Sequence, residues 1–244
     1  MLKQINVQGQ DSMEQFVLNE TRIKRYDNGV RDLEYKVDLA QGSDNKYEIA
    51  GCIYDTDRYI YPETFGDYRE PAVKAISRLI GMDNSLFDYK NLLVARYNGK
   101  VCGICLFTDG ACRWDDELIA KRLGEEFLNA QRKEGYDHGV EDYFRKIVRH
   151  DDGDDYVELV ACCVDDGYQR KGIAGKMLKK LIEINGSKTI RLAVLSDNDA
   201  AIKLYENNGF VVVEDDVDGF GPRGLKPPKC KIMERKASLP KGGE

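Results

Sequence analysis

The chain of 244 residues is poor in histidine, contains no long apolar run and has no excess of basic residues. No segment approaches the roughly 20 apolar residues that span a bilayer, and the N-terminal residues lack the apolar core of a signal peptide. We therefore expect a cytoplasmic protein. The formal net charge is −6 and no block of Lys and Arg occurs, which argues against a nucleic-acid partner.

Cysteine is present, but in a pattern that argues against disulfides and metal. The 7 cysteines are an odd number. Several lie in strongly apolar runs, which favours reduced, buried thiols: Cys102, Cys105, Cys162 and Cys163. Cys102 and Cys105 have the C-x-x-C spacing, yet a metal site needs a second pair or histidine partners, so we expect no metal. Only His138 and His150 exist, which also argues against a cysteine nucleophile.

Apolar spacing predicts the elements of the first half. Leu33–Leu39 alternates apolar and charged residues, which is typical of a half-buried strand. Helices are expected over about 44–55 and 72–80, and Pro62 between them should break the helical pattern. Asn98-Gly99 predicts a tight antiparallel hairpin between strands at 91–97 and 101–107.

The second half predicts a central strand followed by alternating helices and strands. Tyr156–Val164 is almost wholly apolar, which suits a strand covered on both faces. Further strands are expected at 190–195, 210–213 and 231–233, and helices at 172–184 and 198–208. This order predicts a mixed α/β or α+β domain on a single sheet.

The remaining segments set the expected domain limits. Residues 1–32 are expected to be an N-terminal extension, 33–236 the folded domain and 237–244 a flexible tail. An insertion over about 111–155 shows helical stripes and carries 8 Lys and Arg against 13 Asp and Glu, hence 8 − 13 = −5. It is either a solvated loop or a wall that attracts a cationic substrate.

The segment after the central strand predicts a site for phosphate or pyrophosphate. A short loop leads into a helix, whose first turn has unpaired amides and the positive end of the helix dipole. Gly172, Ala174 and Gly175 keep those amides accessible. Arg170 and Lys171 add positive charge. The alternative is an ordinary strand-to-helix connection with a glycine start.

Two motifs in this order resemble those of the GNAT acetyltransferase superfamily. The family's cofactor loop reads Q/R-x-x-G-x-G/A, and residues 169–174 match it as QRKGIA. The family's N-x-x-A-x-x-L-Y-x-x-x-G-F is matched at every fixed position by residues 198–210, NDAAIKLYENNGF. The resemblance covers about Leu33 to Lys236 and implies a single mixed, mostly antiparallel sheet flanked by helices.

The resemblance implies acetyl-CoA as cosubstrate and suggests which residues bind it. The amides of the cofactor loop would bind the pyrophosphate, namely Gln169, Arg170, Lys171, Gly172, Ile173, Ala174 and Gly175. The pantetheine arm would lie along Tyr156–Val164 and bond the main chain near Cys162 and Val164. The amide of Cys162 would polarise the acetyl carbonyl. Asn198 would bond the pantetheine arm, cap its own helix, or do both.

Two side chains are candidates for proton transfer under the same resemblance. Tyr205 would lie near the coenzyme sulfur and protonate the leaving thiolate, unless it is only a core aromatic. Glu158 matches the position of the base in some family members, and its apolar run would raise its pKa. The alternative for Glu158 is an edge glutamate that faces solvent.

The resemblance therefore implies an N-acetyltransferase that acts on a small-molecule primary amine by direct attack. The alternative is a non-catalytic module that binds acetyl-CoA or a metabolite as a sensor or subunit. The acceptor groove would be built from Tyr59–Pro62 and Val217–Leu225, with Trp114 and Phe220 as further aromatic candidates. A homodimer, in which residues 1–32 cover a neighbouring subunit, stays open.

Overall fold

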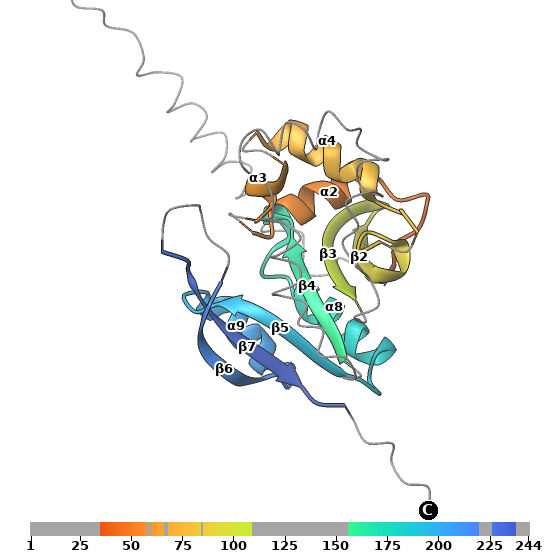
Figure 1. The fold of residues 1–244 in the computed structure, drawn as a ribbon. Helices are drawn as coiled ribbons and strands as arrows, with labels where there is room; N and C mark the ends of the chain where they lie inside the picture. Colours follow the sequence, from red (N-terminus) through yellow and green to blue (C-terminus); the bar gives the residue numbers. More distant parts are fainter. Residues whose placement is uncertain are drawn as a thin grey trace, which may run out of the picture. The chain divides into compact units, whose positions relative to one another are not determined.

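The computed structural model describes residues 35–57, 60–65, 68–83, 85–108, 156–219 and 226–237. The chain divides into two compact units, Met1–Tyr35 and Lys36–Glu244, and the fold described below belongs to the second (Figure 1). The expectations for 1–32, for the insertion with Trp114, and for Tyr59 and Phe220 lie outside the described residues. Within those ranges no helix combines the length and apolar character needed to cross a bilayer.

Within the described residues, seven strands form one sheet in the order β1-β2-β3-β4-β5-β7-β6. They are β1 (Lys36–Leu39), β2 (Leu92–Tyr97), β3 (Lys100–Thr108), β4 (Tyr156–Val164), β5 (Thr189–Leu195), β6 (Val211–Asp218) and β7 (Lys229–Arg235). β4 and β5 pair in parallel, whereas the other neighbours are antiparallel. The predicted mixed, mostly antiparallel sheet is confirmed, with β4 at its centre.

The helices match the expected order except for α3, which was not expected, and their ends are set by local chemistry. They are α2 (Lys46–Tyr54), α3 (Ile60–Phe65), α4 (Arg69–Leu79), α8 (Ile173–Ile184) and α9 (Asp199–Glu206), with 3-10 turns at Tyr89–Asn91 and Asp166–Tyr168. Asn45 caps α2 because its side chain accepts a hydrogen bond from the Tyr47 amide at 3.0 Å. Within α8, Ile173, Met177 and Leu181 are buried at helical spacing.

The expectation that Pro62 breaks the helical pattern is wrong. α3 includes Pro62 as its third residue. A proline in the first turn of a helix removes no helical hydrogen bond, because the first amides have no partner within the helix. The expected hairpin is confirmed, since Asn98 (φ 50°) and Gly99 (φ 77°) both adopt the left-handed conformation that a tight turn between β2 and β3 requires.

The sheet has two faces that are covered by different helices. On one, called here the α2 face, Ile104, Leu106 and Ala161 pack into a core with α2, α3 and α4. On the other, called the α8 face, Gly103 lies against α8, because a Cβ added there would stand 3.1 Å from Cε of Met177. Figure 1 shows α2, α3 and α4 grouped on one side of β3 and β4, with α8 and α9 on the other.

Candidate active site

The parallel strands β4 and β5 are paired at their amino ends and part toward their carboxyl ends (Figure 1). Their register runs from Tyr156↔Thr189 to Leu159↔Leu192 and then stops. β4 continues to Val164 and β5 to Leu195, so both strands extend beyond the last pair. The fork leaves one edge of β4 without a neighbouring strand over its last residues.

Main-chain groups of Cys162 and Val164 point toward this open edge. The amide of Asp165 donates to the carbonyl of Cys102 on β3 at 3.0 Å, so Asp165 faces β3. Successive residues of a strand point their N–H and C=O groups to alternate sides, which turns those of Val164 and Cys162 away from β3. The Val164 carbonyl accepts a hydrogen bond from Nε2 of Gln169 at 3.0 Å. The two residues expected to bond the pantetheine arm thus present main-chain groups to the fork.

A β-bulge at Val160 decides which side chains lie on which face. Leu106 of β3 pairs with Ala161 of β4, but the next residue of β3, Phe107, pairs with Leu159. Val160 of β4 is therefore an additional residue without a partner on β3. Glu158 therefore shares the α2 face with Ala161. The side chain of Cys162, four positions after Glu158, lies on the α8 face.

The turn after β4 has the geometry of an anion site. Gly172 caps α8 with φ 78° and Arg170 has φ 59°, both left-handed. The first helical bond of α8 runs from the Lys176 amide to the Gly172 carbonyl, and the amides of Ile173, Ala174 and Gly175 donate to no described group. A Cβ added at Gly172 or Gly175 would meet nothing within 4 Å, so the amides open onto free space. Such a turn suits phosphate oxygens.

Side chains around the turn hold its shape. Gln169 bonds both the Val164 carbonyl and Oδ1 of Asp166, the latter at 2.8 Å. Nζ of Lys171 donates to the Gly167 carbonyl at 2.8 Å and lies 5.6 Å from the centre of the Tyr168 ring. These contacts fix the positive charge of Lys171 beside the turn rather than in solvent.

Asn198 begins α9 on the next strand-to-helix connection. Its Oδ1 accepts a hydrogen bond from the Ala201 amide at 3.2 Å, so the expected helix cap is present. Its Nδ2 donates to no described residue. The amide group therefore keeps a donor for a ligand, and the predicted contact with the pantetheine arm stays a prediction.

Glu158 is a buried carboxyl group at the closed end of the fork. The residue is 2% exposed, and Oε2 has no hydrogen-bond partner among the described residues. Burial raises the pKa of Glu158 well above its usual value; nearby Arg191 acts in the opposite direction and Glu234 in the same direction. Thr108 on β3 and Arg191 on β5 are its cross-strand neighbours. The expectation of an edge glutamate facing solvent does not apply.

Tyr205 lies on α9, beside the thiols of the α8 face. The residue is 9% exposed, and its ring centre is 5.7 Å from that of Phe210. Burial raises the pKa of Tyr205 well above 10, with smaller contributions from Cys162 and Cys105. Sγ of Cys105 donates to Sγ of Cys162 at 3.3 Å. The phenol is therefore protonated at any neutral pH and adjoins the strand segment that borders the fork.

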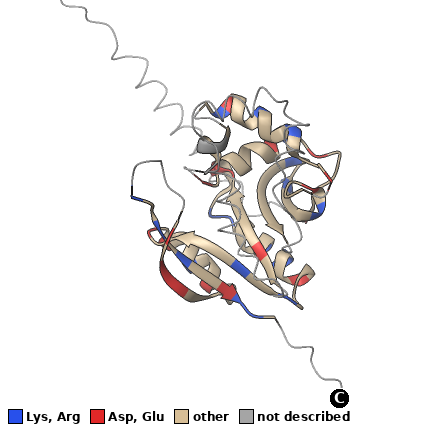
Figure 2. Cartoon of the chain, viewed as in Figure 1, with Lys and Arg blue, Asp and Glu red and all other residues tan. Residues whose placement is uncertain are grey.

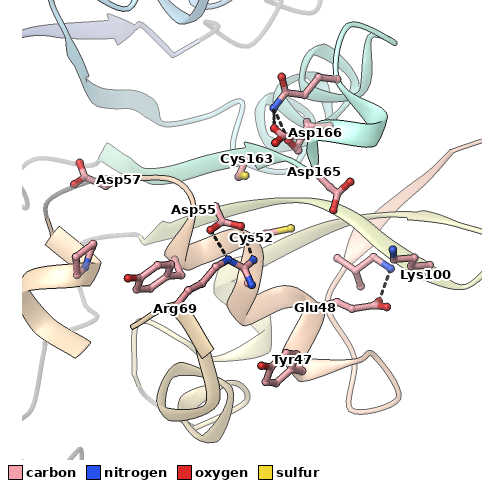
Figure 3. A pocket seen from close by; sticks show the side chains of 16 residues that line it. Tyr47, Glu48, Cys52, Asp55, Asp57, Arg69, Lys100, Cys163, Asp165 and Asp166 are labelled. Carbon is pink, nitrogen blue, oxygen red and sulfur yellow. Dashed lines mark hydrogen bonds and ion pairs between the residues drawn. The ribbon is translucent and has the colours of Figure 1, made fainter. Parts of the chain in front are cut away.

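A cavity of about 840 Å³ lies between α2, α4 and the carboxyl end of β4 (Figure 3). Pro62 lines it from the expected acceptor groove, and Tyr54 and Asp57 line it from the end of α2 and the residues after it. Cys163, Asp165, Asp166 and Gln169 line it from β4 and the turn. Arg69 crosses Gly51 to hold Asp55 with two hydrogen bonds of 2.9 and 2.6 Å. Tyr61, in contrast, is buried and stacks on Phe65.

Sequence reasoning missed Thr108 and Arg191, which flank Glu158 across the sheet. No local pattern in the sequence marks either residue. Their positions depend on the register of three strands and on the bulge at Val160, which no spacing rule supplies. A polar residue within an apolar strand is a signal for a functional residue, and from the sequence we apply it only to Glu158 and not to Thr108 or Arg191.

The acetyltransferase (GNAT) family model matches residues 53–210, and the chain belongs to this family. Over 100 residues the chain is 32% identical to the ribosomal protein bS18-alanine N-acetyltransferase of Escherichia coli, a match that covers 40% of this chain and 64% of that relative. The N-alpha-acetyltransferase RimI of Mycobacterium tuberculosis is 40% identical over 47 residues, which is 19% of this chain and 30% of that relative. The chain thus spans less than two thirds of the length of these relatives.

A solved structure shows the same fold. The crystal structure of an N-acetyltransferase from Staphylococcus aureus Mu50 superposes with a TM-score of 0.55 at 19% sequence identity, over 82% of this chain and 99% of that one. At this identity the likeness extends to the fold and not to the substrate.

Proposed function

We propose that the chain transfers an acetyl group from acetyl-CoA to a primary amine by direct attack of the amine on the thioester. The observation that carries this proposal is the fork between β4 and β5, with an amide-rich turn at the carboxyl end of β4. The fork offers main-chain groups to an extended ligand, and the turn offers amides to its phosphates. Membership of the acetyltransferase family supports the same reading.

The described residues fit coenzyme A in two segments. The free amides of Ile173, Ala174 and Gly175 would hold the pyrophosphate, with Lys171 adding charge beside them. The main-chain groups of Cys162 and Val164 would hold the pantetheine arm in the fork. When bound, acetyl-CoA supplies an acyl group activated as a thioester.

The two faces of the sheet would divide the proton transfers. The amide of Cys162 would donate a hydrogen bond to the acetyl oxygen and stabilise the charge that develops there. Glu158, on the α2 face, would take the proton that the amine loses. Tyr205, on the α8 face, would donate a proton to the departing sulfur, since burial raises its pKa and keeps the phenol protonated.

The acceptor is proposed at the level of a primary amine. The relatives named for alanine and N-alpha acetylation support an amine of this kind, although each is matched only in part. The cavity beside Cys163 is lined by more carboxylates than cationic groups, which would favour the approach of a positively charged amine.

The test combines binding with turnover. We expect acetyl-CoA at about 100 times Kd to stabilise the full chain by about 2.7 kcal/mol, a rise in melting temperature of about 5–10 °C. Release of coenzyme A thiol should then depend on added amine. If millimolar acetyl-CoA leaves the melting temperature unchanged, the protein does not bind this cosubstrate and the proposal is wrong.

A non-catalytic module that binds acetyl-CoA is the second candidate. The observation in its favour is the burial of Glu158, whose Oε2 is closed to solvent and whose pKa is raised. Such a protein would show the rise in melting temperature with acetyl-CoA, but no amine would increase thiol release. If thiol release depends on the amine in the wild type and this dependence disappears in Glu158→Gln, the protein is an enzyme and not a binding module.

A further inference from the structure

A row of polar side chains crosses the α2 face where β4 and β5 begin to part. Register pairs Thr108 with Glu158, Glu158 with Arg191, and Arg191 with Glu234. Neighbouring strands lie about 4.8 Å apart, so successive side chains in such a row are within reach of one another. Glu158 is buried, whereas 19% of the Arg191 side chain is exposed. The row therefore presents one accessible cation next to one enclosed carboxyl group.

Arg191 has hydrogen-bonding capacity that no described residue uses. Its guanidinium stands 3.8 Å from Glu214 and 3.8 Å from Glu234, distances that give charge attraction without a hydrogen bond. Glu234 has a closer cation, because Nζ of Lys236 lies 2.5 Å from it. A guanidinium carries five N–H donors in a planar fork. Arg191 can therefore bind an oxygen of a ligand without breaking a short contact.

The carboxylates around Arg191 offset the cost of placing its guanidinium in a half-buried position. Acidic residues gather along β6, at the edge of the sheet, where the ribbon in Figure 2 is red. Glu214 belongs to this strand, and Glu234 to its neighbour β7. The two carboxylates balance the guanidinium from the side away from β4. Its remaining donors are turned to no described group.

Glu158 is the matching group on β4. Its Oε2 is enclosed and accepts no hydrogen bond from any described residue. Buried polar atoms without a partner are rare in folded proteins, and a catalytic or ligand-binding role is one explanation for them. Beyond Glu158, Val160 and Ala161 pack against the core of the α2 face, whereas beyond Arg191 the next side chain on that face is Ala193, which is exposed. The small side chain of Ala193 leaves room beside Arg191.

We propose that Glu158 and Arg191 together recognise an α-amino carbonyl group, so that the acceptor is an amino acid, its amide or a peptide N-terminus. This inference rests on the proposed function, since it names the amine that the fork receives. In an α-amino carbonyl group the nitrogen and the oxygen are three bonds apart, a separation that suits side chains on adjacent strands. The amine faces Glu158 and the oxygen accepts from Arg191.

Other primary amines lack the second half of this pattern. A polyamine, or the side-chain amine of lysine, carries no oxygen close to its nitrogen. Bound at Glu158, it leaves the donors of Arg191 unused. Arg191 is thus a specificity residue, and its contribution appears in the binding of the acceptor rather than in the rate of the chemical step.

Two amines of similar size, one with the carbonyl and one without it, test the proposal through the change that each substitution of Arg191 makes. L-Alaninamide has the α-amino carbonyl group, and isopropylamine replaces its carboxamide by a methyl group. Acetyl transfer by the full chain is followed as release of coenzyme A thiol. We expect Arg191→Gln to raise KM for L-alaninamide by about 10- to 100-fold more than for isopropylamine, as for loss of a hydrogen bond to a charged group. Isopropylamine makes no bond to Arg191, so its kcat/KM should change only because the substitution also removes the charge that lowers the pKa of Glu158, an effect that both amines share.

Matched variants separate recognition from stability. Arg191→Lys keeps the charge without the forked donors and should give an intermediate KM for L-alaninamide. Arg78→Gln removes an exposed arginine from α4 and should change neither amine. A melting curve of each variant without ligand shows whether the fold is kept. Alanine and an alanine tripeptide, used in place of the amide, then distinguish a free amino acid from a peptide N-terminus.

The outcomes for the two proposals differ. If Arg191→Gln lowers kcat/KM equally for both amines, or if the wild type turns over both amines equally well, recognition by Arg191 is wrong while acetyl transfer to amines stands. If the wild type binds acetyl-CoA but acetylates no amine, the proposed function fails and the inference fails with it.

Discussion

The two halves of β4 contribute different kinds of group to the candidate site. Tyr156–Leu159 pairs with β5 on one side, Glu158 and Leu159 also pair with β3 on the other, and all four residues are buried. From Val160 to Val164 the strand pairs with β3 alone, and most residues are only half-buried. One short strand thus combines a buried segment with an open edge.

The difference decides which groups can act. In the half that pairs with β5, the main-chain groups are used in the hydrogen bonds of the sheet, so only side chains such as Glu158 can act on a substrate. In the unpaired half the amides of Cys162 and Val164 are themselves the ligand groups. Substitutions in the first half should therefore alter turnover, and substitutions at the turn beyond the second half should alter binding of acetyl-CoA.

The largest effect is expected for Glu158→Gln, which keeps the size of the side chain and removes the base. We expect kcat/KM for the amine to fall by about 10²- to 10⁴-fold, the usual contribution of a general base. Thiol release at saturating acetyl-CoA measures it, and binding of acetyl-CoA should be unchanged. Glu206→Gln, at an exposed position of α9, is the matched control. Undiminished activity in Glu158→Gln would show that the paired half of β4 does not supply the base.

The same variant should affect stability with the opposite sign. Because the pKa of Glu158 is raised in the fold, its contribution to stability is complete below the unfolded value near pH 4.5 and is lost as pH rises through the folded pKa. Glutamine does not ionise. The melting temperature of Glu158→Gln should therefore exceed that of the wild type increasingly as pH rises from 4.5. A difference that stays constant with pH would contradict the burial of this carboxyl group.

The sequence allowed much of this fold to be predicted, because its signals are local. The apolar run Tyr156–Val164, the Asn98-Gly99 turn and the glycine-started helix α8 each depend on neighbouring residues. The two family motifs likewise lie on continuous segments, residues 169–174 and 198–210. The helix through Pro62 was not foreseen, because proline is tolerated or excluded according to its position in the first turn.

The face of the sheet on which each site residue lies could not be predicted from the sequence, because it depends on one bulge. Simple alternation along β4 puts Glu158 and Cys162 on the same face, since they are four positions apart. The additional residue at Val160 reverses that parity, so the two lie on opposite faces. Arg191 is found only once the register of β4 and β5 is known. The pairing of distant strands therefore determines which side chains meet in the site, whereas local sequence patterns determine where the helices and strands lie.

Tyr205→Phe should have the next largest effect. Removing the hydroxyl leaves the ring and its contact with Phe210, so the fold should be kept. We expect kcat to fall by about 10- to 100-fold with little change in KM, because the lost proton transfer acts on the departing sulfur. The raised pKa of Tyr205 keeps the phenol protonated, so no loss of wild-type activity below pH 10 should trace to it. Tyr68→Phe, at a residue 82% exposed, is the control.

Gly175→Asp should weaken cofactor binding while the helix gains stability. Aspartate in the first turn of α8 interacts favourably with the helix dipole, and a Cβ there meets nothing within 4 Å. The same charge repels a pyrophosphate bound at the free amides, so KM for acetyl-CoA should rise about 10-fold or more. Gly175→Ala is the control and should leave KM nearly unchanged. Equal KM values in both variants would mean that the turn does not bind the pyrophosphate.

The smallest effect is expected for Gly172→Ala, which isolates backbone strain from contact. Gly172 has φ 78°, and a Cβ there meets nothing within 4 Å, so the cost is that of placing alanine in a left-handed conformation, about 1 kcal/mol. For a domain of this size that lowers the melting temperature by about 2–4 °C. Gly42→Ala has equal space without a positive φ and should be neutral or slightly stabilising. If both variants melt alike, the turn can relax to a right-handed conformation. The amides of Ile173 and Ala174 would then not be fixed before acetyl-CoA arrives, and the unpaired end of β4 would owe its binding to ligand-induced order.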